Sequence, residues 1–294
     1  MNDIVSVIVT TKNEETNIEN ILYSINLQTY KKKEIILVDN YSTDKTIEKA
    51  KKFNIKLINH GKERSEQRNI GIRKSHGKYC LYLDADMILT PNLVTSLVKK
   101  IKQKKIKGIF IKEKIFGKTL LSRIRNYERE FYEKSSVDAI RFFDRDCFNK
   151  INGFDETITG QEDWDFSQRF QEKFHTGLLN FKIDKSLLFK NNNFYSKFIN
   201  LKDLEYECIM HNETNMSLNE YINKKKYYIK TIEYYKKKNL HNSNLREQFS
   251  FSGRLKIFFS TKKNVKRIFL KPHKFLLVIL IKIYVYLKAD FKKI

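Results

Sequence analysis

The stretch KYCLYLDADMILTP, residues 78–91, decides the fold class of this chain. A short apolar run ends abruptly in Asp84-Ala85-Asp86, and Pro91 follows five residues later. A short apolar run bounded by turn-forming residues is typical of a strand that is buried on both faces of a parallel sheet. Two carboxylates at the tip of such a strand do not belong to a core, so they raise the question of function.

The residues before this stretch alternate between strand and helix patterns. Apolar runs at 4–10 and 33–40 predict two more buried strands, and residues 55–60 predict a further short strand. Helical patterns fill 16–28, 42–53 and 65–77, the first with a capping box of Thr16 and Glu19 and the last closed by Gly77. Thr90 as the cap and Pro91 as a first-turn proline predict the start of a further helix. Four alternations in about 100 residues predict an α/β fold with a mostly parallel sheet and right-handed crossovers.

Polar residues gather where the predicted strands end. In parallel sheets, ligands bind beyond the carboxyl ends of the strands. The residues at these ends are Thr10, Thr11, Asn13, Asp39, Asn40, Asp84 and Asp86. The two aspartates of D-A-D can present oxygens to Mg²⁺ or Mn²⁺, although a solvated turn is the alternative. Asp39 can accept hydrogen bonds from a base or ribose, or it can simply form the following turn.

Two common nucleotide motifs are missing from the sequence. No GxGxxG follows the first strand, and no GxxxxGK[ST] occurs. We therefore predict neither a dinucleotide site nor a P-loop.

A second acidic cluster lies in GQEDWDF, residues 160–166. We expect a helix to begin near Glu162, and acidic residues in a first turn complement the helix dipole. The functional interpretation makes Asp163 a general base that faces the cation site. Trp164, the only tryptophan, is either a core anchor or a stacking wall for a sugar.

Four segments together resemble a known family. VSVIVTTKNEE, EIILVDNYSTDKT, RNIGIRKSHGKYCLYLDAD and GFDETITGQEDWDF resemble, in order and spacing, the motifs of family 2 glycosyltransferases. The resemblance covers roughly residues 3–170. It implies the Rossmann-like GT-A fold, a nucleotide-sugar donor and an inverting single displacement.

The resemblance also implies roles for residues on the donor side. Thr10, Thr11 and Glu14 match the loop that lines the nucleotide pocket, and Asp39 matches the aspartate that contacts the base. The chain departs from the commonest pattern at Thr10, Lys12 and Asn40, where proline, tyrosine and aspartate are frequent.

Further roles follow from the third motif. Arg68 and Asn69 match a pair beside the nucleotide and diphosphate. Asp84 matches the ribose- or sugar-side aspartate, and Asp86 matches the ligand of a Mg²⁺ or Mn²⁺ ion.

The remaining implied residues act on the acceptor side or complete the metal shell. Asp163 matches the base that takes the proton from the acceptor hydroxyl, with Glu162 as the alternative base. His211, in CIMHNET, matches a late histidine that completes the metal shell or touches the diphosphate. A structural histidine is the competing interpretation.

Composition divides the chain unevenly. The net charge is +24, and residues 215–294 carry 20 Lys/Arg against 4 Asp/Glu, a net charge of +16. Such a section implies an anionic partner. We expect a nucleotide-sugar-binding half at 1–110, an acceptor-binding half at 111–214 and a basic helical membrane-associating section at 215–294. Three distant cysteines favour a reducing compartment, and the N-terminus lacks a signal-peptide pattern.

The end of the chain carries a short apolar segment. Residues 275–287 are thirteen mostly apolar residues interrupted by Lys282 and flanked by lysines. They are too few to span a bilayer, which needs about 20. A core helix, an interfacial or re-entrant anchor and a spanning helix are the options, and the basic flanks favour an anchor on anionic lipid.

The sequence thus predicts a metal-dependent glycosyltransferase that is peripheral to the cytoplasmic face of the cell membrane. Its expected acceptor is a hydroxyl of a polyprenyl-linked saccharide. One alternative is a polyprenyl-phosphate monosaccharide synthase, whose acceptor is the lipid phosphate itself. The other is a nucleic-acid-binding protein, which the charge motivates. No zinc finger, helix-turn-helix or RNP-like pattern supports that alternative, so we expect no nucleic-acid partner.

Overall fold

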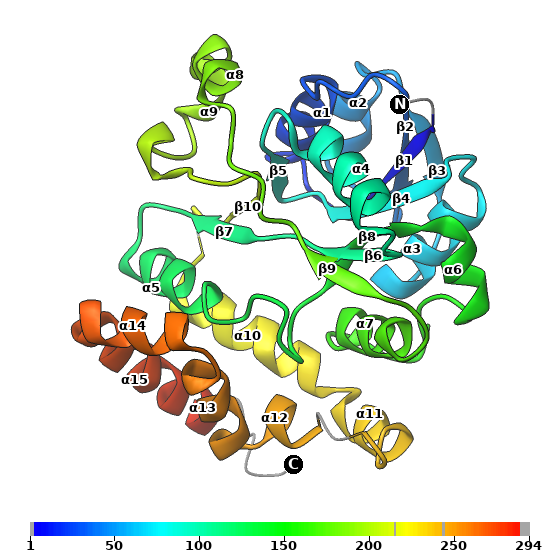
Figure 1. Ribbon diagram of the computed structural model, residues 1–294. Helices are drawn as coiled ribbons and strands as arrows, with labels where there is room; N and C mark the ends of the chain where they lie inside the picture. Colours follow the sequence, from blue (N-terminus) through cyan, green and yellow to red (C-terminus); the bar gives the residue numbers. More distant parts are fainter. Residues whose placement is uncertain (1–2, 215, 243–244, 289–294) are drawn as a thin grey trace.

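The computed structural model describes residues 3–214, 216–242 and 245–288, and its centre is a seven-stranded sheet (Figure 1). The strand order is β3-β2-β1-β4-β8-β6-β9. The first four run parallel, β8 runs antiparallel between β4 and β6, and β9 is parallel to β6. Their bounds are β1 Val5–Thr11, β2 Lys33–Asp39, β3 Lys56–Asn59, β4 Tyr79–Asp84, β6 Gly108–Phe110, β8 Ile140–Asp144 and β9 Thr176–Leu178. The prediction of a mostly parallel α/β sheet is confirmed.

Helices cover both faces of this sheet (Figure 1). On one face Leu81 and Leu83 of β4 pack with α1 (Ile18–Asn26), α2 (Thr46–Ala50) and α4 (Leu93–Lys104). On the other face Cys80 and Tyr82 pack with α3 (Arg64–Arg73), α6 (Arg145–Lys150) and α7 (Glu162–Lys173). Because successive side chains of a strand point to opposite faces, a strand covered on both sides is apolar throughout. This explains the continuous apolar runs of the sequence.

A smaller sheet brings a distant segment beside the D-A-D turn. Its order is β5-β10-β7, with bounds Met87–Leu89, Ile209–Asn212 and Glu113–Phe116. β5 follows β4 almost directly, and His211 of β10 pairs with Met87 of β5. The register therefore places His211 next to Asp86.

The C-terminal helices are α10 (Leu218–Ile229), α11 (Ile232–Lys238), α12 (Leu245–Phe249), α13 (Phe251–Phe259), α14 (Lys262–Leu270) and α15 (Pro272–Lys288). Of these, α10, α13, α14 and α15 pack against α5 (Leu120–Arg129), while α11 contacts α7 and the loop before it. Phe258 and Val278 are buried in one cluster with Phe131. Other residues of α15, Leu280 among them, are exposed. Within the described ranges, no helix is both long and apolar enough to cross a membrane.

The remaining elements form a projection at the top of Figure 1. They are α8 (Lys185–Lys190), α9 (Asn192–Tyr195) and the 3₁₀ helix η1 (Leu201–Asp203). Tyr195 anchors this part, since it is buried and donates a hydrogen bond to the carbonyl of Leu89 at 2.9 Å.

Three local predictions about helix ends are wrong. The capping box of Thr16 and Glu19 does not form, because α1 begins at Ile18 and the residue before it is Asn17. Thr90 does not cap α4; its hydroxyl donates to Glu207 at 2.5 Å, and the helix begins at Leu93. α3 ends at Arg73, before Gly77, whose N–H donates to Ser6 Oγ at 2.8 Å. At the last two positions a distant partner replaces the local motif.

Candidate active site

The predicted strand-end residues are neighbours in the sheet. Thr10 pairs with Asp84, and Thr11 pairs with Asp39. The hydroxyl of Thr10 donates to Asp84 Oδ1 at 3.3 Å. The hydroxyl of Thr11 is buried and has no hydrogen-bond partner among the residues that the structure describes. A buried hydroxyl without a hydrogen-bond partner is uncommon inside proteins and marks a candidate position for a ligand.

The loops after β1 and β2 are tied to each other. Asn13 adopts a left-handed φ of 53°, its N–H donates to Ser42 Oγ at 2.8 Å, and its side-chain oxygen accepts from the N–H of Thr43 at 2.8 Å. Asp39 accepts from the N–H of Ser42 at 2.8 Å and from its hydroxyl at 2.5 Å. The turn-forming role of Asp39 is therefore observed, while its contact with a base stays a prediction.

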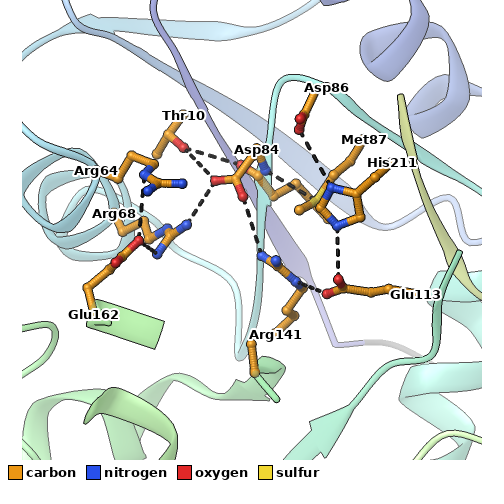
Figure 2. Close-up of polar contacts among 12 residues, drawn as sticks. Thr10, Arg64, Arg68, Asp84, Asp86, Met87, Glu113, Arg141, Glu162 and His211 are labelled. Atoms are coloured by element: carbon orange, nitrogen blue, oxygen red, sulfur yellow. Dashed lines mark hydrogen bonds and ion pairs between the residues drawn. The ribbon is translucent and has the colours of Figure 1, made fainter. Parts of the chain in front are cut away.

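Arg68 joins the two acidic clusters (Figure 2). One guanidinium nitrogen lies 2.8 Å from Asp84 Oδ1 and another lies 3.1 Å from Glu162 Oε1. The Arg68 side chain is 1% exposed and lies over the ring of Tyr82, 4.7 Å from the centroid. Burial alone would raise the pKa of Asp84, but Arg68 and the other nearby arginines outweigh it and hold that pKa well below its usual range. The first turn of α7 and the end of β4 therefore form one charge network.

A second branch of the network reaches the D-A-D turn (Figure 2). Arg141 Nε lies 2.5 Å from Glu113, and its Nη1 lies 3.8 Å from Asp84. Glu113 also bonds His211 Nε2 at 2.9 Å, and His211 Nδ1 lies 3.9 Å from Asp86 Oδ1. Asp84 and Asp86 are thus linked to the same pair, Arg141 and Glu113.

Asp86 and His211 fit a divalent cation. Asp86 Oδ1 is buried and makes no hydrogen bond within the described chain. The bond from Nε2 to Glu113 holds the imidazole with Nδ1 toward Asp86, which is the arrangement by which a carboxylate orients a metal-binding histidine. The described residues contain no cluster of three His, Cys, Asp or Glu side chains that could hold a metal alone. Further ligands would come from a bound molecule, as is usual for Mg²⁺ and substrate phosphates.

Asp163 and Glu162 have different surroundings. Glu162 is buried between Arg68 and Arg64, the latter at 3.5 Å; burial would raise its pKa, but the two arginines keep it lowered. Asp163 accepts no side-chain hydrogen bond from the described residues, and its pKa is raised to about 6 by burial and by the charge of Glu162. Arg68 and Arg141 limit that rise. Asp163 is therefore the carboxylate of the two without a side-chain partner in the described chain, and its role as a base stays a prediction.

Asp163 opens into a cavity of about 320 Å³, which we call the α7 cavity. Arg141 and Glu113 also line it, so it connects the proposed base with the charge network. Its other walls come from α5, α10, α13 and α15. Trp164 forms part of the wall, with the guanidinium of Arg254 5.0 Å from its ring centroid. The wall position of Trp164 is observed, whereas sugar stacking on it stays a prediction.

Two further predicted residues serve their local structure. Asn69 donates to the carbonyl of Phe154 at 2.9 Å and to Glu156 at 2.7 Å, and it accepts from the N–H of Phe154 at 2.9 Å. It therefore holds the loop that precedes α7. Glu14 accepts from Asn17 at 2.8 Å, and burial, followed by the charge of Asp86, raises the pKa of Glu14 to about 7.

Sequence reasoning missed Arg64, Glu113 and Arg141. Arg141 did leave a signal, because a buried arginine inside the apolar run AIRFF needs a carboxylate partner. Which carboxylate it meets depends on the antiparallel insertion of β8 beside β4, and no local pattern encodes that pairing.

Residues 6–156, just over half of the chain, match the family described as Glycosyl transferase family 2. This chain belongs to glycosyl transferase family 2. The family 2 chain is 35% identical over 109 residues to Glycosyltransferase GlyA of Streptococcus pneumoniae serotype 4. This match covers 34% of this chain and 15% of the relative. It is also 33% identical over 105 residues to a dolichol-phosphate mannosyltransferase of Pyrococcus furiosus. This second match covers 33% of this chain and 30% of the relative. The chain spans less than two thirds of these relatives' own lengths.

Solved structures agree with the family 2 assignment at the level of the fold. Staphylococcus aureus TarS superposes with a TM-score of 0.54 at 20% identity and covers 84% of this chain and 44% of its own. Mannosyltransferase PcManGT from Pyrobaculum calidifontis, solved with GDP-Man and Mn²⁺, superposes with a TM-score of 0.56 at 14% identity. That match covers 98% of this chain and 82% of PcManGT. The fold is therefore GT-A.

Proposed function

We propose that this chain is a metal-dependent inverting glycosyltransferase that moves a sugar from a nucleotide-sugar donor to a hydroxyl of a polyprenyl-linked saccharide. The main support is the ion-pair chain from Asp84 through Arg68 to Glu162. It places the carboxyl end of β4, where ligands bind in such sheets, beside the segment that carries Asp163. Structural neighbours have been solved with UDP-GlcNAc and with GDP-Man, which supports a nucleotide-sugar donor.

In the proposed reaction Asp163 accepts the proton of the acceptor hydroxyl. The hydroxyl oxygen bonds to the anomeric carbon, and the bond from that carbon to the donor phosphate oxygen breaks. The nucleoside diphosphate leaves with the bonding electrons, and direct displacement inverts the configuration. A base is needed because an alcohol is a poor nucleophile near neutral pH.

Asp86 and His211 would hold a Mg²⁺ or Mn²⁺ ion, with Glu113 orienting the histidine. When bound, such an ion stabilises the negative charge that develops on the leaving diphosphate. The Mn²⁺ complex of PcManGT supports this assignment by likeness of fold.

We further propose that the protein acts at the cytoplasmic face of the cell membrane, to which it binds peripherally. Supporting this, apolar side chains are exposed on the last two helices: Phe269 is 80%, Leu276 58% and Leu280 52% exposed. Lys262, Lys266, Lys271, Lys274 and Lys288 lie on the same two helices or between them. Exposed apolar groups flanked by lysines suit the interface of an anionic membrane.

A polyprenyl-phosphate monosaccharide synthase is the second candidate. The match to a dolichol-phosphate mannosyltransferase favours it. In that reaction the acceptor is a lipid phosphate, which is already ionised and has less need of a base. Asp163→Asn therefore separates the two candidates: it should slow transfer to a hydroxyl by about 10²- to 10⁴-fold and transfer to a lipid phosphate much less.

The direct test of the proposed function measures donor binding and donor use. Nucleoside diphosphates and their sugars are screened by thermal shift with and without Mn²⁺, because a ligand that binds the folded state raises Tm. Donors that bind are then assayed for nucleoside diphosphate release. Absence of any Tm increase and of any release across the panel would contradict the proposal.

A further inference from the structure

The α7 cavity carries more positive than negative charge along the wall that α5, α10, α13 and α15 form. Four cations line that wall: Arg125 of α5, Lys225 of α10, Arg254 of α13 and Lys282 of α15. Two of them have carboxylate partners. Lys282 lies 2.5 Å from Glu128, and Arg125 forms an ion pair with Glu213. Lys225 and Arg254 lie within ion-pair distance of no carboxylate in the described ranges.

Lys225 stands in surroundings that do not compensate its charge. It is half-buried, and its ammonium lies 5.2 Å from the ring centroid of Tyr221 and 5.8 Å from that of Tyr228. Burial, together with the charges of Arg125, Lys282 and Arg254, lowers the pKa of Lys225 to about 7, although Glu128 acts in the opposite direction. A cation held among cations costs folding free energy unless an anion joins it.

Arg254 presents its guanidinium to the cavity that the proposed base also lines. Its Nε donates to the carbonyl of Gln248 at 2.6 Å, which fixes one edge of the group. Its guanidinium carbon lies over the ring of Trp164, the residue that follows Asp163. A planar guanidinium held in this way can bind two phosphate oxygens at once. A group bound there would leave an attached sugar next to Asp163.

We propose that Lys225 and Arg254 bind a phosphate group of the acceptor, so that the α7 cavity takes a phosphosaccharide and not a neutral sugar. The inference rests on the proposed function, because it makes this cavity the acceptor side of the same site. Glu213 and Glu128 pair with Arg125 and Lys282, so the two cationic side chains of this wall without a carboxylate partner among the described residues are Lys225 and Arg254. Their charge matches that of a phosphate monoester or a diphosphate. The aromatic walls, Trp164, Tyr221 and Tyr228, suit the faces of sugar rings.

The phosphate can come from a lipid or from a soluble phosphosaccharide. α15 lines the cavity with Lys282 and Val285 and exposes Leu280 and Ile283 to solvent. The test therefore uses two phosphate probes and their matched alcohols: farnesyl phosphate with farnesol, and glycerol 3-phosphate with glycerol. Binding to the full chain is measured by calorimetry in the presence of the nucleoside diphosphate that gives the largest Tm increase.

The variants are Lys225→Met and Arg254→Gln, with Lys226→Met as the matched control. Lys226 is the next residue of α10 and is exposed, so its removal changes the net charge equally without touching the cavity. We expect each cavity variant to weaken phosphate binding by about tenfold or more and the control to change it by less than about twofold. Each variant should keep the wild-type Tm increase with nucleoside diphosphate, which shows that it is folded and that the donor site is intact.

A second readout separates binding from structure. Phosphate should raise the pKa of Lys225, so binding at pH 8 should take up a proton, and the measured enthalpy should depend on the ionisation enthalpy of the buffer. Lys225→Met should abolish that dependence. Binding of farnesyl phosphate alone assigns a lipid source, and binding of both phosphates assigns the shared phosphate chemistry. Equal binding of phosphates and alcohols, or unchanged affinity in both cavity variants, overturns the inference even if donor binding is intact.

Discussion

Replacing Arg68 tests whether the charge network holds the two halves of the site together. Arg68→Met keeps the length of the aliphatic stem and removes the guanidinium that contacts Asp84 at 2.8 Å and Glu162 at 3.1 Å. Both carboxylates lose their nearest partner, since Arg141 lies 3.8 Å from Asp84 and Arg64 lies 3.5 Å from Glu162. Removing one partner of a buried ion pair costs about 3–5 kcal/mol.

This cost converts to a measurable change in Tm. An unfolding entropy of about 2.1 cal/mol/K per residue gives roughly 0.6 kcal/mol/K for a chain of this length, so Arg68→Met should lower Tm by about 5–8 °C. The control is Arg73→Met on the same helix. Arg73 lies 3.9 Å from Glu156 with both side chains about half-exposed, and such a pair contributes little. Its Tm change should stay below about 1 °C, measured by circular dichroism or calorimetry.

The pH dependence of the difference tests the cause. The pKa values of Asp84 and Glu162 are lowered in the folded state, so their contribution to stability is present above the unfolded pKa, about 4, and is lost as pH falls through the folded values. The Tm difference between wild type and Arg68→Met should therefore be largest near pH 7 and should shrink at pH 3. A Tm loss no larger than that of Arg73→Met, or a difference that is the same at both pH values, would refute the reasoning.

Three other expectations concern the base, the cation and the membrane. Because the pKa of Asp163 is raised to about 6 and a base must be ionised, kcat/KM should fall about tenfold per pH unit below pH 6, and Asp163→Asn should remove this acid limb. Asp86→Asn should abolish the Mn²⁺-dependent part of the Tm increase with nucleoside diphosphate; an undiminished Mn²⁺ effect would exclude Asp86 as a ligand. Leu280→Glu should weaken binding to anionic vesicles by about tenfold or more in a sedimentation assay. Phe189, which is at least as exposed as Leu280 and lies on α8 at the opposite end of the molecule in Figure 1, is the control, and an equal loss in Phe189→Glu would argue against docking through α15.

The sequence was sufficient for the fold because its pattern is local. Each apolar run such as VSVIVTT is long enough to specify a strand buried on both faces, and each intervening stripe specifies a crossover helix. The placement of Asp39 and Asp84 was also predictable, since carboxyl ends of parallel strands share one edge, and the acidic first turn indicated the helix start at Glu162. Helix ends were less predictable. Thr90 illustrates why: its partner Glu207 lies 117 residues away, and a buried carboxylate competes successfully with a capping position.

The connections inside the site depend on pairings that no local pattern encodes. His211 reaches Asp86 only because β10 pairs with β5 in a register that sets His211 opposite Met87. Glu113 reaches His211 because β7 is the other neighbour of β10. Arg68 was assigned to the diphosphate by resemblance, yet its hydrogen bonds go to Asp84 and Glu162, and only tertiary contacts reveal this.

The C-terminal helices do more in this structure than present a basic surface. The N–H of Thr159 donates to Thr231 Oγ1 at 2.8 Å, and Gln161 Nε2 donates to the carbonyl of Tyr228 at 3.0 Å. Gly160 adopts a φ of +85°, and a Cβ at that position would lie 2.6 Å from the side chain of Tyr228. The loop that leads into Glu162 and Asp163 is therefore fixed against α10 and the start of α11. The same helices wall the α7 cavity, so a displacement of these helices would also displace the loop that leads into the proposed base.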